Sequence, residues 1–237
     1  MEIDLNHIND FLFDLDDTLI STHRIFVDQM RKNANYVASL DDSSNEEDVM
    51  NYLWKLVDCA YSTVIVNPSK LWKEVLDGLD KEYHLSTEAR HKIQKNIDDI
   101  YSAVPELLDG SLELLDHIVS KSKGLGLVTH AERDWTIYKL ESTGLIKYFS
   151  NIYLVDVNEF KGKQHWRNAA RLFGFHKQTC CTVGDSLKGD IIPTYQEGFH
   201  TQVYLDSGSG WSVYNVDDVP IEVIRVASPK EMLMMIK

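Results

Sequence analysis

A short apolar run near the N-terminus, residues 8–13, is followed by two carboxylates, Asp14 and Asp16. Such a run is typical of a strand that is buried on both faces of a parallel sheet. Residues two apart in extended backbone point to the same side, so both carboxylates are expected to emerge together at the carboxyl end of this strand. Open α/β sheets bind their ligands at that end. The run therefore predicts a sheet whose ligand site is built around Asp14 and Asp16.

This pair of acids can carry a nucleophilic reaction. Two neighbouring carboxylates repel each other, so their environment can leave one ionised and the other protonated. An ionised Asp can attack phosphorus and form an aspartyl-phosphate. Its protonated neighbour can then pass a proton to the leaving alcohol and later activate water. A turn or a helix cap after the strand is the alternative interpretation, because Asp and Thr are common at both.

After this strand the pattern of the chain changes. Between residues 21 and 104 the apolar residues recur at helical spacing, which predicts a helical block without the alternating order of an α/β fold. Asn67-Pro68-Ser69 marks the start of one helix, and Ser86 offers a cap before the last. The expected helices span residues 24–40, 46–60, 69–79 and 86–101, and residues 63–66 are the one weak candidate for a strand.

Strands and helices alternate from Pro105 onward, which predicts a doubly wound, Rossmann-like α/β fold with a mostly parallel sheet covered on both faces. The first strand has no other partner, so it must join this sheet. The expected domains are a core of residues 1–20 and 105–237 and a helical insert of residues 21–104. The strands expected after Pro105 span residues 124–129, 151–155, 179–183, 200–205 and 222–226. The expected helices span residues 110–122, 132–143, 163–173, 188–196 and 229–235. Residues 207–220 are expected to form a surface loop.

The net charge of −13 argues against nucleic acid or an anionic membrane as a partner. A small anionic substrate remains compatible with it, because a divalent metal and a few local cations can reverse the field inside one pocket. The three cysteines have no zinc or disulfide spacing, which favours reduced thiols in a cytoplasmic protein. Neither a signal peptide nor a membrane-spanning run is visible. The oligomeric state, monomer or homodimer, is not readable from the sequence.

Three later stretches carry candidate site residues. Thr129 and His130 end the expected strand 124–129, where a hydroxyl and a backbone N–H could contact a phosphate, although an ordinary helix start is an equal alternative. Lys161 and Lys163 precede the expected helix 163–173. A positioned ammonium there could balance the charge of a nucleophilic carboxylate and a phosphoryl group. Lys161 lies closer to the end of the preceding strand and is preferred, but loop lysines are usually only solvated.

The last stretch is Gly184-Asp185, which follows an apolar strand, with Asp190 five positions after the first acid. Hard divalent ions such as Mg²⁺ prefer oxygen ligands. Asp185, the Asp14 carboxylate and the backbone carbonyl of Asp16 would supply a suitable set. Gly184 would allow the backbone to approach the site closely. The alternative is a simple turn.

Together these four stretches resemble the motifs of the haloacid dehalogenase (HAD) superfamily. The first motif, Asp-x-Asp-x-Thr, is matched by Asp14, Asp16 and Thr18. The others are matched by Thr129, by Lys161 or Lys163, and by the Gly184, Asp185 and Asp190 set. The chain departs from the family pattern at His130, where many relatives have Asn, and at Gly162, where Pro often follows the lysine.

The resemblance implies a helical C1 cap at residues 21–104 and an Mg²⁺-dependent enzyme. It implies catalytic roles for Asp14, Asp16 and Lys161, metal ligation by Asp14, Asp16, Asp185 and Asp190, and substrate contacts from Thr129, His130 and Lys163. Asp16 favours an alkoxide leaving group, because a halide needs no proton to depart. The expected function is hydrolysis of a small phosphorylated metabolite, with a phosphomutase, a dehalogenase or a non-catalytic binding protein on the same fold as alternatives.

Overall fold

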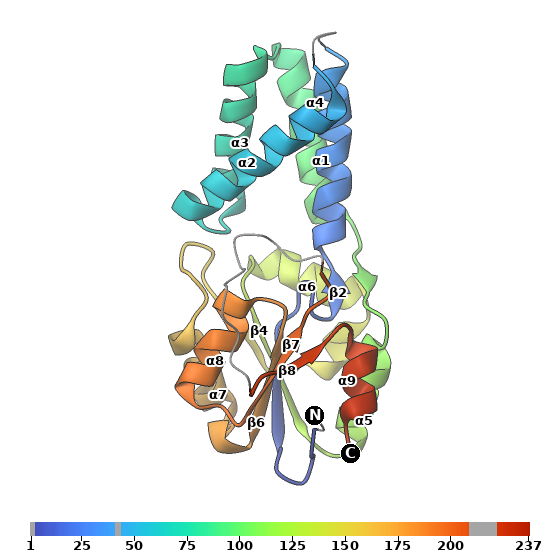
Figure 1. The fold of residues 1–237 in the computed structure, drawn as a ribbon, viewed down its shortest axis with the longest axis vertical. Helices are drawn as coiled ribbons and strands as arrows, with labels where there is room; N and C mark the ends of the chain where they lie inside the picture. Colours follow the sequence, from blue (N-terminus) through green and yellow to red (C-terminus); the bar gives the residue numbers. More distant parts are fainter. Residues whose placement is uncertain (1–2, 41–43, 209–221) are drawn as a thin grey trace. The chain divides into compact units, whose positions relative to one another are not determined.

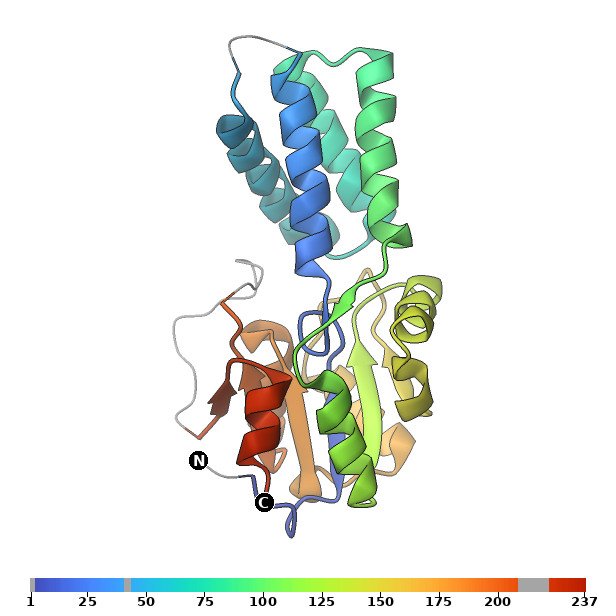
Figure 2. The same cartoon turned by 90° about the vertical axis from the view of Figure 1, so that its right-hand side faces the viewer.

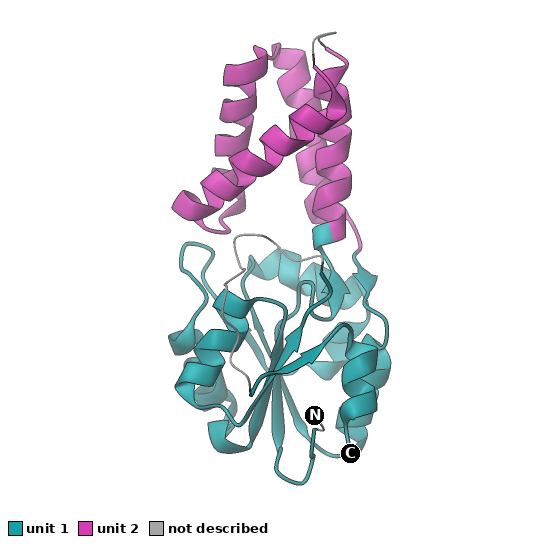
Figure 3. Cartoon of the chain, in the orientation of Figure 1, with its two compact units in different colours: residues 1–23, 105–237 teal, residues 24–104 magenta. Residues whose placement is uncertain are grey.

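The computed structural model describes residues 3–40, 44–208 and 222–237, and the chain forms two compact units (Figure 3). One unit comprises residues 1–23 and 105–237, and the other comprises residues 24–104. The first contains the sheet, whereas the described residues of the second are helical or connect helices. Within the described ranges, no helix combines the length and the apolar character that crossing a bilayer requires.

Six parallel strands form the sheet of the first unit, in the order β5-β4-β1-β6-β7-β8 (Figures 1 and 2). This arrangement confirms the predicted α/β fold with a mostly parallel sheet. The strands are β1 Asp10–Phe13, β4 Gly124–Thr129, β5 Ile152–Leu154, β6 Cys180–Gly184, β7 Thr201–Leu205 and β8 Ile224–Val226.

Strand β1 lies at the centre and is buried on both faces, as its apolar sequence predicts. Phe11 and Phe13 point into one core cluster and Leu12 into another, and all three are fully buried. Helices α5 (Ser111–Ser120), α6 (Arg133–Ser142) and α9 (Pro229–Met235) pack into the first cluster, and α7 (Lys163–Phe173) packs into the second (Figure 1).

The order of the strands creates a switch point beside β1. The chain runs outward through β4 and β5 on one side of β1 and through β6, β7 and β8 on the other. Phe13, the last residue of β1, pairs with Leu127 of β4 and with Val183 of β6, which lie two residues and one residue before the ends of their strands, so the three carboxyl ends lie at one edge of the sheet. In open α/β sheets a ligand site lies at such a point, outside the carboxyl ends of the strands.

The described residues of the second unit form four helices, each with several buried apolar positions. Three of them begin at a side-chain cap, because Asn45, Asn67 and Ser86 each accept a hydrogen bond from a backbone N–H three residues on. Inside the unit, Asn96 donates to Asn33, which satisfies two buried amides. The helices are α1 His23–Ala38, α2 Glu46–Val64, α3 Pro68–Tyr83 and α4 Thr87–Ser102.

Two local predictions were wrong. The strand candidate at 63–66 is instead the end of α2, which continues to Val64, followed by a two-residue turn in which Ile65 has a φ of 60°. The helix expected at 188–196 is divided into a π-helical turn, Leu187–Ile191, and α8, Ile192–Glu197. Pro193 lies in the first turn of α8, where its missing N–H costs no helical hydrogen bond.

A two-stranded ribbon was not predicted. Strand β2 (Ile20–Ser21) precedes the helical unit in the sequence and β3 (Glu106–Leu107) follows it, and the two strands pair antiparallel. Two residues are too few for an alternating pattern to be visible in the sequence. The loop expected at 207–220 falls almost entirely outside the described residues.

Gly126 of β4 offers a test of the packing between the sheet and α7. A methyl group there would lie 2.8 Å from side-chain carbons of both Leu12 and Phe173. Gly126→Ala is therefore expected to lower the free energy of unfolding by about 1–3 kcal/mol through overpacking. Urea unfolding followed by circular dichroism measures this. Gly162→Ala, whose added carbon meets nothing closer than 3.7 Å, is the control. Equal stability of the two variants would contradict the packing described for β4.

Candidate active site

Asp14 follows the last residue of β1 and is buried between the two neighbouring strands. Its backbone N–H donates to the carbonyl of Val183 at 2.9 Å, which continues the pairing of β1 with β6 by one residue. Its Oδ1 accepts a hydrogen bond from Lys161 Nζ at 2.6 Å, and its Oδ2 accepts one from the Thr18 hydroxyl at 3.1 Å. Both oxygens are therefore fixed by donors from within the same unit.

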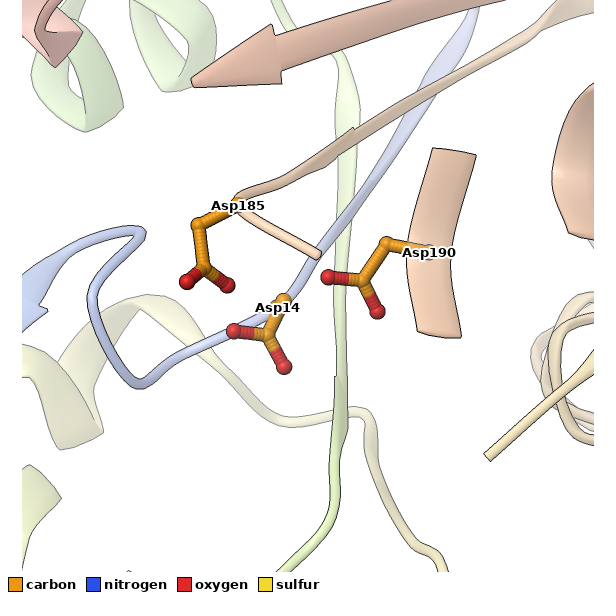
Figure 4. Close-up of side chains that lie close together, drawn as sticks. All are labelled: Asp14, Asp185 and Asp190. Carbon is orange, nitrogen blue, oxygen red and sulfur yellow. The ribbon is translucent and has the colours of Figure 1, made fainter. Parts of the chain in front are cut away.

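Asp185 and Asp190 join Asp14 from the other side of the switch point (Figure 4). One carboxylate oxygen from each of the three residues lies within 4.8 Å of the others. A methyl group on Gly184 would lie 2.5–2.7 Å from the side chain of Asp190, so glycine is needed for this close approach. The Ser186 backbone N–H donates to Asp190 Oδ2 at 3.1 Å and thereby orients this carboxylate.

Lys161 brings a positive charge into the cluster. It lies in the loop between β5 and α7, and its Nζ is 2.6 Å from Asp14 Oδ1 and 2.7 Å from Asp190 Oδ1. The ring of Trp166 lies 4.7 Å from the same ammonium. Lys163, by contrast, is exposed in the first turn of α7. The structure therefore places Lys161, and not Lys163, against the carboxylates.

Burial and mutual repulsion shift the pKa values of this cluster. Burial, and then the charges of Asp190 and Asp16, raise the pKa of Asp14 to about 7 against the opposing effect of Lys161. Burial and the neighbouring carboxylates likewise raise the pKa of Asp185. The charges of Asp14 and Asp190 raise the pKa of Lys161 although burial alone would lower it. Lys161 therefore stays positively charged at neutral pH.

The cluster has the composition of a site for a hard divalent cation. Three carboxylates and one ammonium leave two negative charges when all the acids are ionised, which one divalent cation would balance. Mg²⁺ prefers oxygen ligands of this kind and usually keeps several waters. Asp14, Asp185 and Asp190 are the residues that could hold it.

Asp16 has different partners from Asp14. Lys139 Nζ contacts its two carboxylate oxygens at 2.6 and 2.7 Å, and the Thr22 hydroxyl donates to Oδ1 at 2.5 Å. The carboxylate is thus not a member of the three-acid cluster. A metal contact from the Asp16 backbone carbonyl stays a prediction. Lys139 was missed in the sequence, where a lysine on a short helix gives no signal of its burial.

Asp17 is a second residue that sequence reasoning missed. Its carboxylate accepts hydrogen bonds from the backbone N–H groups of Thr22 and His23, which closes the loop after Asp16. Its φ of 55° lies in the left-handed region, which Asp tolerates better than most residues. Burial raises the pKa of Asp17 to about 7. These hydrogen bonds indicate that Asp17 stabilises the loop.

Thr129 and His130 lie at the end of β4, as predicted. The Thr129 hydroxyl is buried and has no hydrogen-bond partner among the described residues. His130 Nε2 lies 3.1 Å from the carbonyl of Asp156, which can accept only from a protonated nitrogen. Burial and the charge of Lys161 lower the pKa of His130 to about 4, so the ring is neutral at pH 7. His130 is thus held by the loop between β5 and α7.

Comparison with known proteins agrees with this arrangement. The family model of the haloacid dehalogenase-like hydrolases matches residues 9–193, which include every member of the acidic cluster. This chain belongs to that family. No curated protein matches the sequence.

Solved structures share the HAD fold at low sequence identity. A haloacid dehalogenase-like hydrolase from Xanthomonas campestris superposes with a TM-score of 0.76 at 17% identity, covering 96% of this chain and 90% of that one. A putative β-phosphoglucomutase from Thermotoga maritima gives a TM-score of 0.68 at 16% identity, with 96% and 97% covered. The magnesium-bound putative HAD-hydrolase YfnB from Bacillus subtilis gives 0.67 at 16%, with 96% and 98% covered. These likenesses show the fold.

Metal binding to this HAD hydrolase should depend on pH. With a pKa of about 7, Asp14 is mostly protonated at pH 6 and mostly ionised at pH 8, so at pH 6 a cation must displace a proton from Asp14 that is mostly absent at pH 8. Mg²⁺ is expected to raise the melting temperature more at pH 8 than at pH 6, as measured by thermal shift. Asp185→Asn should remove most of the shift, and Asp98→Asn, at an exposed position on α4, should leave it unchanged. An equal shift at both pH values would contradict the assignment.

Proposed function

We propose that this HAD hydrolase is an Mg²⁺-dependent phosphomonoesterase that forms an aspartyl-phosphate on Asp14. The observation that carries the proposal is the surroundings of Asp14: an ammonium at 2.6 Å on one oxygen and two further carboxylates within reach of a shared cation. An attack of an anionic carboxylate on an anionic phosphoryl group requires such charge compensation. A binding module would have no need to bury three acids around one lysine.

Each residue has a role that follows from its position. An Asp14 oxygen attacks phosphorus, the P–O bond to the alcohol breaks, and Asp16 gives its proton to the departing oxygen. Asp16 then takes a proton from the water that attacks phosphorus, and this attack releases phosphate and restores the Asp14 carboxylate. Lys161 balances negative charge on Asp14 throughout. An Mg²⁺ ion held by Asp14, Asp185 and Asp190 would supply further charge stabilisation.

Two features favour phosphoryl transfer over dehalogenation. Asp16 supplies a proton donor and acceptor two residues after the nucleophile, which the departure of a halide would not use. The buried Thr129 hydroxyl lacks a partner among the described residues, and an oxygen of a bound phosphoryl group would supply one. We further propose that the helical unit, residues 24–104, acts as the cap that selects a small phosphorylated substrate and that the protein is cytoplasmic.

The proposal predicts metal-dependent release of inorganic phosphate from at least one small phosphomonoester. A panel of sugar phosphates, phosphoglycolate, nucleoside monophosphates and aryl phosphates would be assayed with Mg²⁺ and with EDTA. Asp14→Asn is expected to lower kcat by more than about a thousand-fold, because it removes the nucleophile. Asp98→Asn, on the surface of α4, is the matched control and should retain full activity.

Three outcomes would contradict the proposal. Phosphate release that survives in Asp14→Asn would exclude Asp14 as the nucleophile. Halide release from haloacids without phosphatase activity would assign the chain to the dehalogenases. Isomerisation of a sugar phosphate without net release of phosphate would identify a mutase.

A further inference from the structure

Lys139 is a fully buried lysine whose ammonium contacts the proposed proton-transfer residue. Its side chain is 0% exposed, which is rare for lysine. Its Nζ lies 2.6 Å from Asp16 Oδ1 and 2.7 Å from Asp16 Oδ2, so one donor group engages both oxygens. The two residues are separated by more than a hundred positions in the chain and belong to α6 and to the loop after β1.

Helix α6 holds the ammonium in a fixed place. The ring of Trp135, one turn earlier, lies 3.8 Å from Lys139 Nζ and adds a cation–π contact. Thr136 and Leu140 are buried beside it, so this face of α6 is packed against the unit. These contacts restrict the long side chain of Lys139, so that its ammonium holds the Asp16 carboxylate in one position.

Thr22, at the other end of the loop that begins after β1, also holds the Asp16 carboxylate. Its hydroxyl donates to Asp16 Oδ1, so this oxygen accepts from two donors and Oδ2 from one. The Asp16 side chain is nevertheless 25% exposed. A proton-transfer group needs both features, because its oxygen must be held within hydrogen-bond reach of the reacting atom and still be accessible to it.

Stability alone gives no reason for this pair. Removing a lysine from water carries a large desolvation cost, and well-packed apolar residues often replace buried ion pairs with no loss of stability. A methionine would fill much the same volume on α6 and would leave the partly exposed Asp16 free to contact water. The ion pair therefore points to a function that depends on where the Asp16 carboxylate lies.

We propose that Lys139 is a positioning residue that orients the Asp16 carboxylate for proton transfer. This inference rests on the proposed phosphomonoesterase function. Lys139 acts through Asp16 alone, so its contribution must disappear when Asp16 can no longer transfer a proton. It acts on the rate of the reaction and not on the binding of substrate, since it contacts no member of the three-acid cluster in the structure.

A double-mutant cycle with para-nitrophenyl phosphate tests this inference. This substrate has a good leaving group, so the Asp16→Asn enzyme should still form the aspartyl-phosphate, and its slower turnover would be measured at high enzyme concentration. Lys139→Met is expected to lower kcat by roughly 10- to 100-fold, as small misplacements of a reacting group do, with KM changed less than about twofold. In the Asp16→Asn background the same substitution should change kcat less than about twofold, because residues that act as a unit are not additive.

Three further variants separate positioning from folding. Lys139→Arg keeps the charge and the hydrogen bonds and should restore most of the rate. Lys147→Met removes an exposed lysine that contacts the Tyr148 ring and should have no effect. Thr22→Val removes the other donor to Asp16 and should lower kcat in the Asp16 enzyme and not in Asp16→Asn, which provides the same test if Lys139→Met fails to fold.

Two results would overturn the inference while leaving the proposed function in place. One is an equal loss of kcat from Lys139→Met in both backgrounds, which would show that Lys139 acts independently of Asp16. The other is a folded Lys139→Met enzyme with the wild-type kcat. A wild-type enzyme that hydrolyses no phosphomonoester would instead contradict the proposed function, and with it the inference.

Discussion

The ammonium of Lys161 lies between two buried carboxylates, and the rest of the site depends on this interaction. Without it, Asp14, Asp185 and Asp190 would bring three acids within 4.8 Å of one another, with no ion pair to another cation among the residues that the structure describes. Such a cluster would be costly to bury. With it, the remaining charge matches one divalent cation, and Asp14 keeps a donor on the oxygen opposite Thr18. The same contact therefore compensates the charge of the cluster and holds Asp14, the residue that we propose as the nucleophile.

The sheet brings these groups together because of its strand order. Strand β1 lies between β4 and β6, so residues that follow three strands far apart in the sequence meet at one edge. The fully apolar Phe11-Leu12-Phe13 segment holds β1 in both core clusters, which makes the position of Asp14 rigid. The donors come from the segments that follow the neighbouring strands. Lys161 arrives from the loop after β5, and Lys139 from the helix after β4.

Much of this could be predicted from the sequence, because local patterns determine it. The apolar run before Asp14, the β/α alternation after Pro105 and the acids around Gly184 gave the fold and most of the cluster. Contacts between distant segments could not be predicted, since no local pattern encodes them. Lys139 resembles any helical lysine until α6 packs against the loop of Asp16, and the pairing of β2 with β3 requires the chain to return after the whole helical unit.

Peptide mass spectrometry after an acid quench would show whether Asp14 becomes covalently phosphorylated, as the proposed mechanism requires. The Asp16→Asn enzyme would be mixed with Mg²⁺ and its best phosphomonoester, because loss of the general base should slow hydrolysis of the intermediate. We expect one added phosphoryl group on the peptide that contains Asp14, and fragmentation should locate it on Asp14 itself. A phosphoryl group on another residue, or a full turnover of substrate with no covalent enzyme species at any quench time, would contradict it.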